Sequence, residues 1–146
     1  MGTRADFYVG RGKDANWLGS IAWDGYPDGI PKELLESQTE EEFIKEVMKF
    51  LGARKDSTLP VDGWPWPWND SHTTDYAYAF DNGKVWGSCF GCEWFDPLLS
   101  DEEIDKVIED SKEHAVVFPD MTSIKNVNFG KRSGLIIIGS KGVENL

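Results

Sequence analysis

The sequence has no long hydrophobic run, few cysteines and no low-complexity block. The apolar run at residues 135–138 is far too short for a membrane-spanning helix, which needs about 20 residues. The first residues show no signal-peptide pattern, and the chain has two cysteines. We therefore expect a cytoplasmic protein in a reducing compartment, with no membrane partner.

Basic residues are scarce compared with acidic ones. The chain has 15 lysines and arginines against 26 aspartates and glutamates, giving a formal net charge of −11. Nucleic-acid-binding proteins carry a positive surface, so this charge argues against a nucleic-acid partner. It is compatible with a solubilising surface, with a basic protein partner, or with an acidic inhibitor that imitates DNA.

The length of 146 residues predicts a single domain over 1–146. Hydrophobic residues make up 40% of the chain and seven are tryptophans, which is typical of a globular protein with a sizeable core. We expect the last residues, 140–146, to fray. The pattern assigns no firm structure to residues 115–146.

The clearest local signal is Asp-Asn-Gly-Lys at 81–84. Asn82 and Gly83 tolerate the positive φ that both central residues of a type I′ hairpin turn require. This turn sets a register in which Phe80 faces Val85. Both faces of the hairpin carry apolar residues, so we predict that it lies centrally in a sheet. The small alanines on one face would let a helix approach closely.

Apolar periodicity and turn residues extend this hairpin to an α+β fold. Two capping boxes, one at 39–42 and one at 100–103, predict helix starts. We expect an antiparallel sheet of four or five strands with two main helices and a short one mostly on one face. The strands are predicted at 5–9, 17–23, 75–80 and 84–90, with 134–138 as a fifth left open, and the helices at 31–37, 39–51 and 100–113.

Residues 53–74, which we call the Trp-Pro strap, have no periodicity and contain alternating tryptophans and prolines. Prolines impose extended backbone, so Trp64, Trp66 and Trp68 would project from a stiff segment that covers the other face or an edge of the sheet. The indoles could pack as core, or form a platform that binds a partner or a small molecule.

Cys89 and Cys92 form a single C-x-x-C motif. A tetrahedral zinc site needs four ligands, and His72 and His114 are the remaining candidates of the usual kind. Nothing in the spacing requires the four to converge, so ordinary buried thiols are the simpler interpretation.

His72 lies between two aspartates at 70 and 75, an arrangement that could serve acid–base chemistry. Asp24, Tyr26 and Asp28 occupy a turn rich in glycine and proline. A pocket between this turn, His72 and the strap tryptophans would suit a small-molecule binder or a hydrolase. The sequence has no Gly-x-Ser-x-Gly motif, and no catalytic residue is assigned.

Thr3-Arg4 at the start, followed by Trp-Asp-Gly-Tyr-Pro at 23–27, resembles small phage and prophage proteins that begin M-x-T-R and carry a W-D-G-Y-P motif after their second strand. The resemblance covers about the first 30 residues. Those relatives have Cys-His directly before the motif, where this chain has Ile21-Ala22, so a cysteine-based role is not transferred. The resemblance implies a phage-associated setting and no particular reaction.

Three hypotheses follow. The first is a non-enzymatic, host-interacting binding protein that uses the strap tryptophans or acidic helix faces; the DNA mimic is a variant of it. The second is the small-molecule binder or hydrolase. The third is a zinc-stabilised domain.

Overall fold

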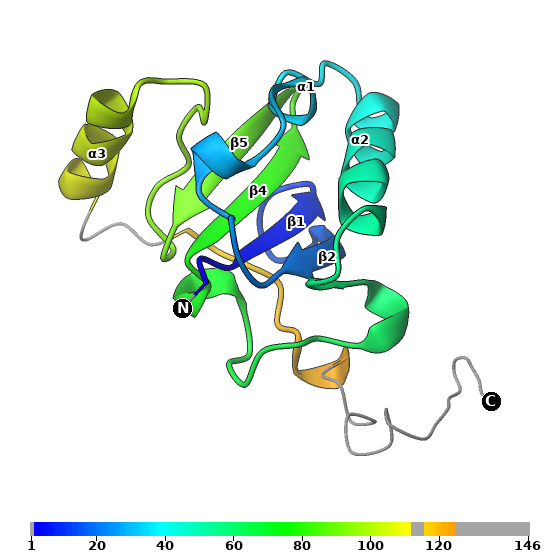
Figure 1. Ribbon diagram of the computed structural model, residues 1–146. Helices are drawn as coiled ribbons and strands as arrows, with labels where there is room; N and C mark the ends of the chain where they lie inside the picture. The colour runs from blue at the N-terminus through cyan, green and yellow to red at the C-terminus, as the bar shows by residue number, and fades with distance from the viewer. Residues whose placement is uncertain (1, 112–115, 125–146) are drawn as a thin grey trace.

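The structure is a computed structural model that describes residues 2–111 and 116–124. It is an α+β fold: a five-stranded sheet with two main helices and a short one, as the sequence predicts (Figure 1). The strand expected at 134–138, the frayed end at 140–146 and His114 lie outside the described residues. In the part that is described, no helix is both long and apolar enough to cross a bilayer.

The sheet is mixed, whereas the sequence predicted an antiparallel one. Its order is β3-β2-β1-β4-β5, and β1 pairs with β4 in parallel while the other neighbours are antiparallel. The parallel pair forms because the strap returns the chain to the side of β1 before β4 begins. The strands are β1 (Ala5–Val9), β2 (Asn16–Ile21), β3 (Ser57–Thr58), β4 (Tyr76–Asp81) and β5 (Lys84–Cys89).

The hairpin of β4 and β5 has the predicted register, with Phe80 opposite Val85 and Asp81 opposite Lys84. Its position was predicted only in part. Strand β4 is internal, but β5 is the last strand of the sheet. The outer edge of β5 is partly covered, because Gly87 and Phe95 exchange two backbone hydrogen bonds of 2.8 Å.

The helices are α1 (Lys32–Leu35), α2 (Glu40–Gly52) and α3 (Asp101–Asp110). Both predicted helix starts are capped, but only one of the two predicted capping boxes is complete. Ser100 and Glu103 form the full box. Thr39 Oγ1 accepts from the backbone N–H of Glu42 at 3.1 Å, while the Glu42 carboxylate accepts from the backbone N–H of Gln38 at 3.0 Å instead of from Thr39. The acidic residues in these first turns also favour the positive end of the helix dipole.

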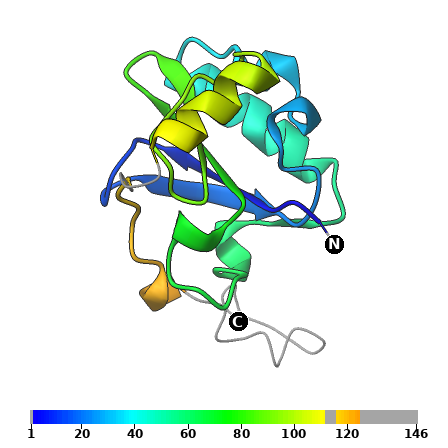
Figure 2. The same ribbon diagram turned by 90° about the vertical axis from the view of Figure 1, so that its left-hand side faces the viewer.

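The helices cover one face of the sheet (Figure 2). Phe7 from β1 and Tyr78 from β4 stack on this face with ring centroids 5.6 Å apart, and Phe43 of α2 stacks on Phe80. A smaller cluster at the β5 side joins α3 to the sheet. The buried members of the larger cluster are Ala5, Phe7, Ile21, Ile30, Leu34, Leu35, Phe43, Val47, Leu51, Tyr78, Phe80 and Val85.

The Trp-Pro strap and residues 116–124 cover the opposite face, below the sheet in Figure 2. Ala77 and Ala79 lie on this face. The expectation that a helix would approach these alanines is therefore wrong. Aromatic and sulfur-containing side chains of the two segments pack against them instead. The buried residues of this cluster are Tyr8, Trp17, Trp64, Ala77, Ala79, Phe118 and Met121.

A bulge in β2 decides which of its side chains reach the strap. The pairing with β1 shifts register between Phe7 and Tyr8, beside Gly19, whose φ is +146°. The extra residue places both Trp17 and Ser20 on the strap face, where simple alternation would separate them.

Candidate functional site

The turn at residues 23–29, which we call the WDGYPDG turn, begins just after β2 and crosses the helix face of the sheet. Asp24 has a φ of +67°, an unusual conformation for a residue other than glycine. The backbone N–H of Gly25 donates to Thr3 O at 2.8 Å, and the Tyr78 hydroxyl donates to Gly25 O at 2.7 Å. A Cβ at Gly25 would lie 2.8 Å from the backbone of Arg4, so this position requires glycine.

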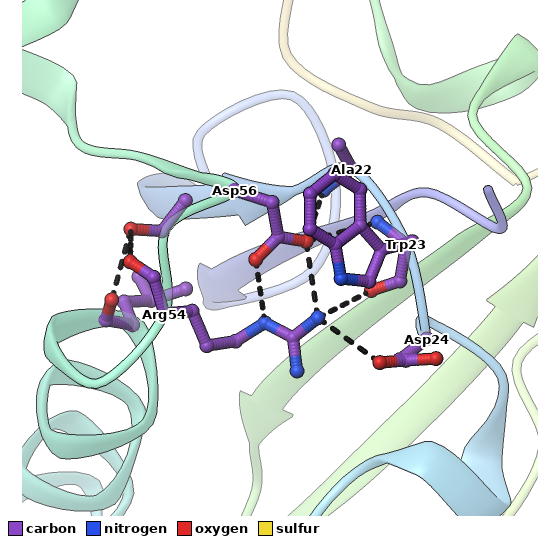
Figure 3. A network of polar contacts seen from close by, with 7 residues as sticks. Ala22, Trp23, Asp24, Arg54 and Asp56 are labelled. Carbon is purple, nitrogen blue, oxygen red and sulfur yellow. Dashed lines mark hydrogen bonds and ion pairs between the residues drawn. The ribbon is translucent and has the colours of Figure 1, made fainter.

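Arg54 and Asp56 connect the start of this turn to the end of α2. The guanidinium of Arg54 donates to both carboxylate oxygens of Asp56, at 2.7 and 3.1 Å, and also to Trp23 O at 3.0 Å and Asp24 Oδ2 at 3.2 Å. Asp56 in turn accepts from the backbone N–H groups of Ala22 and Trp23, each at 3.0 Å. Figure 3 shows the guanidinium between the two carboxylates.

The Asp56 side chain is 1% exposed, and its ionisation state follows from these contacts. Burial acts to raise the pKa of its carboxyl, but the hydrogen bonds from Arg54, Trp23 and Ala22 outweigh it, and the pKa is lowered. The carboxylate is therefore charged throughout the neutral range. Sequence reasoning missed both residues, because a bidentate pair two positions apart has no recognisable spacing.

Two aromatic side chains of this rigid turn remain exposed. Trp23 is 49% exposed and Tyr26 is 43% exposed. Large aromatic side chains on a backbone held by several hydrogen bonds lose less entropy on binding, and tryptophan and tyrosine are common at the energetic centre of interfaces. Tyr26 and Asp28 were predicted as site residues because they lie in a sequence typical of a turn. The structure has a turn at these residues.

Next to this turn is a cavity of 320 Å³, which we call the Tyr26 pocket. One wall comes from the WDGYPDG turn and the other from α3, with Tyr76 of β4 between them. Aromatic and apolar groups thus alternate with three carboxylates. The lining residues are Tyr26, Pro27, Asp28, Tyr76, Asp101, Ile104 and Asp105.

The charge of the Tyr26 pocket is uncompensated. Among the residues that the structure describes, Asp28, Asp101 and Asp105 form no ion pair. Burial raises the pKa of Tyr76, and the neighbouring Cys89 and the Asp105 charge add to this effect. Tyr76 is therefore a neutral ring with its proton in place, and the charges in the pocket come from the aspartates.

A larger cavity of 650 Å³ lies between α1, the start of α2 and the β4–β5 turn. It is also acidic, but its lining contains no aromatic residue, and one of its carboxylates, Asp96, pairs with Lys84 at 3.0 Å. Glu33, Glu36 and Glu42 supply its other carboxylates. This cavity is a useful internal comparison for the Tyr26 pocket.

The three strap tryptophans point their indole N–H groups into the molecule. Trp64 is fully buried, lies edge-on to Trp17 and donates to Trp68 O at 2.6 Å. Trp66 and Trp68 are half-buried and stack on each other, with the guanidinium of Arg4 5.0 Å from the ring of Trp68. These contacts match the packing interpretation of the strap; binding by the outer edges of Trp66 and Trp68 stays a prediction.

Beneath the strap is a buried carboxylate that sequence reasoning did not single out. Asp6 is fully buried, and its oxygens accept from Ser20 Oγ at 2.5 Å, Trp66 Nε1 at 2.7 Å and Ser71 Oγ at 2.6 Å. The Ser71 hydroxyl also bonds the Tyr8 hydroxyl at 2.5 Å. The available signal was an acidic residue inside an apolar strand, Ala-Asp-Phe-Tyr-Val.

His72 lies near the end of the strap, in a short 3-10 turn at Ser71–Thr73, and does not face the WDGYPDG turn. Its Nδ1 is 3.1 Å from Asp70 Oδ1 and its Nε2 is 2.5 Å from Val116 O, so both ring nitrogens have partners. Its ring packs edge-on against Phe118. The predicted pocket of His72, Trp66 and Trp68 with the turn is not formed, because the sheet lies between these tryptophans and Tyr26.

Cys89 and Cys92 flank a tight turn in which Phe90 and Gly91 both have positive φ. Both thiols are free, and Cys92 Sγ is 3.1 Å from the backbone nitrogen of Cys89. Burial raises the pKa of Cys89 to about 11, which disfavours the thiolate that zinc requires. Across residues 2–111 and 116–124, no group of three histidine, cysteine or acidic side chains could bind a metal ion; with His114 undescribed, the four-ligand site stays a prediction.

Comparison with known proteins returned no match, either to a family model, to a curated protein or to a solved structure. The resemblance of the first 30 residues to phage proteins therefore stays a prediction.

Proposed function

We propose that this chain is a non-enzymatic binding protein that docks a basic partner protein through the WDGYPDG turn and the adjoining Tyr26 pocket. The observation that carries the proposal is the combination of a fixed backbone with exposed aromatics. Arg54, Asp56 and Tyr78 all bond the backbone of the turn or of the residue before it, yet Trp23 and Tyr26 remain 49% and 43% exposed. Such preorganised aromatic side chains suit a protein interface.

The charge of the chain supports a basic partner. The net charge is −11, and three unpaired aspartates line the pocket beside Tyr26. An acidic surface attracts a basic partner over several ångströms and repels nucleic acid, and the attraction weakens as salt screens it. In the phage-associated setting that the resemblance of the first 30 residues implies, such a partner would be a protein of the host.

The hydrolase hypothesis has less support. His72, the residue on which it depended, directs both ring nitrogens to protein oxygens, and its neighbour Asp70 also caps the turn that follows it. The strap tryptophans are less suited to docking than Trp23, because their polar groups already have internal partners. The DNA-mimic hypothesis has no feature in the structure that favours it over a basic partner protein.

The first test is affinity capture with matched surface variants. The double variant Trp23→Ala/Tyr26→Ala removes both exposed aromatics of the turn. The control Val61→Ala/Phe90→Ala removes two apolar side chains elsewhere that are even more exposed, at 67% and 58%. We expect immobilised wild-type protein and the Val61/Phe90 variant to capture the same partner from a lysate of host cells, and the Trp23/Tyr26 variant to lose it.

The captured partner is then purified and titrated calorimetrically. We expect the Trp23/Tyr26 variant to bind at least tenfold more weakly, since interface aromatics typically contribute more than about 1.4 kcal/mol. Binding should weaken steadily as salt is added. Equal affinity of the Trp23/Tyr26 variant and the wild type would refute the proposal.

A further inference from the structure

The Tyr26 pocket has the shape and chemistry of a site for one cationic group. Its 320 Å³ exceeds the volume of a water molecule or a bare ion several-fold, and its lining combines two tyrosines with three aspartates. Aromatic rings and carboxylates both attract a cation.

The protein supplies no cation of its own to this cavity from its described residues. Its three described arginines are engaged elsewhere: Arg4 with Asp75, Arg11 with Asp81, and Arg54 with Asp56. The comparison cavity between α1 and the β4–β5 turn differs here, because Lys84 already lies in its wall beside Asp96. The Tyr26 pocket therefore presents negative charge to a group from outside.

The geometry argues against a metal ion as the occupant. A divalent ion needs several oxygens that converge within about 2.6 Å of one point. No described group of three acidic, histidine or cysteine side chains is placed to do this, so the three aspartates of the pocket are spread along its walls. An extended cation with apolar faces fits such a lining better.

A guanidinium group meets these requirements. It is planar, stacks on tyrosine rings, and donates several hydrogen bonds in its own plane to carboxylates. The carboxylates of Asp28 on one wall and of Asp101 and Asp105 on the other can accept them. Ile104 on the α3 wall of the pocket offers the methylene stem of the side chain an apolar contact.

We infer that the Tyr26 pocket binds the guanidinium group of an arginine side chain on the partner protein. This inference rests on the proposed function, since it names the part of the partner that the same surface recognises. It makes the pocket the specificity-determining element, with Trp23 beside it as an apolar anchor.

The test uses the whole protein and a minimal probe, acetyl-arginine methylamide, followed by NMR. The matched probe is acetyl-citrulline methylamide, which has nearly the same shape and no charge. We expect saturable shifts of the Ile104 methyl and the Tyr26 and Tyr76 ring signals with the arginine probe, and an affinity lower by roughly tenfold or more with citrulline.

Variants of α3 separate the pocket from general electrostatics. Asp105→Asn removes a pocket carboxylate, and Asp110→Asn removes the same charge from an exposed position of the same helix outside the pocket. We expect Asp105→Asn and Tyr26→Leu each to weaken arginine binding several-fold, and Asp110→Asn to leave it unchanged. All three residues are exposed, so each variant should keep the native spectrum elsewhere.

Three results would overturn the inference: equal binding of arginine and citrulline, equal loss in the two aspartate variants, or shifts confined to the cavity of Glu33 and Lys84. The proposed function is judged separately. If arginine does not bind but partner capture still depends on Trp23 and Tyr26, the inference fails and the binding function stands. If arginine binds as expected but capture is independent of Trp23 and Tyr26, the docking proposal fails.

Discussion

At the scale of single residues, Asp6 connects the sheet to the strap through polar contacts alone. Burial raises the pKa of its carboxyl, and the hydrogen bonds from Ser20, Ser71 and Trp66 only partly offset this effect. The folded state therefore binds the proton more tightly than the unfolded chain does. The stability that this provides is complete below the unfolded pKa and is lost as the pH rises through the folded-state pKa.

Replacing Asp6 by asparagine tests this linkage. Asparagine keeps an oxygen that can accept from Ser20 and Trp66, and its amide can donate to Ser71, but it does not titrate. We expect the free energy of unfolding of the wild type to fall, relative to that of Asp6→Asn, as the pH rises from about 4 towards neutrality. Urea denaturation across this range measures the difference.

The variant Asp6→Ala is the control for the hydrogen bonds. It leaves the indole N–H of Trp66 and two hydroxyls without their acceptor, so we expect a loss of about 2 kcal/mol or more at every pH. If the difference in unfolding free energy between wild type and Asp6→Asn did not change with pH, the pKa of Asp6 would be the same in the folded and unfolded states.

At the scale of elements, the conformation of the WDGYPDG turn is stabilised by residues that are distant in the sequence. The turn residues Pro27 and Gly29 indicate a change of direction, and the structure has one there. The sequence does not show that Arg54 and Asp56, about 30 positions later, bond its first residues. This contact is what allows Trp23 to stay exposed on an immobile backbone.

Removing the guanidinium of Arg54 should therefore weaken the turn. In Arg54→Met the Asp56 carboxylate loses its ion pair while remaining buried, and we expect the unfolding free energy to fall by about 3 kcal/mol at pH 7. The pKa of Asp56 is lowered in the fold, so its stabilising contribution is present above the unfolded pKa and lost as the pH falls through the folded-state pKa.

The difference between wild type and Arg54→Met should accordingly shrink below about pH 4, which urea denaturation at several pH values measures. Lys49→Met is a matched control, since Lys49 is a mostly exposed cation of α2 that makes a long ion pair of 3.8 Å with Glu46. If the unfolding free energy fell no further in Arg54→Met than in Lys49→Met, a structural role for the Arg54–Asp56 pair would be contradicted.

At the scale of the whole molecule, the sheet has two cores of different kinds. On the helix face, aliphatic side chains of α1 and α2 pack with the phenylalanine and tyrosine rings of α2, β1 and β4. On the other face, tryptophans of the strap pack with Phe118 and Met121. Apart from the two residues of β3 and two short 3-10 turns the strap is irregular, and it depends on burying its indoles, because a long irregular segment loses much conformational entropy on folding.

Trp64 should be the most costly of these indoles to remove. It is 1% exposed and contacts Trp17 at 5.2 Å between ring centroids. We expect Trp64→Ala to lower the unfolding free energy by about 3–5 kcal/mol, as for other large core truncations. In Trp23→Ala, where the ring is half-exposed, the loss should stay within about 1 kcal/mol. If the denaturation curves of the two variants coincided, Trp64 would not be a core residue.

Much of the local structure follows from residues that are neighbours in the chain. Asn82 and Gly83 determine the hairpin turn and its register, and Thr39 and Ser100 determine where two helices begin, because each effect needs only a few adjacent backbone groups. Exposure of the turn at 23–29 was less predictable, since it depends on what packs beneath it.

The sequence by itself determined the α+β class, the hairpin with its register and the helix caps, and it left open whether the strap covers the other face of the sheet or an edge. Only the tertiary structure decided that β1 runs parallel to β4, that β5 lies at an edge, and that Tyr26 meets Ile104 across a pocket. The physical reason is that alternation and capping act over a few residues. Pairing between segments 50 to 80 positions apart depends instead on which packing arrangement of the whole chain buries the most apolar surface while satisfying its polar groups.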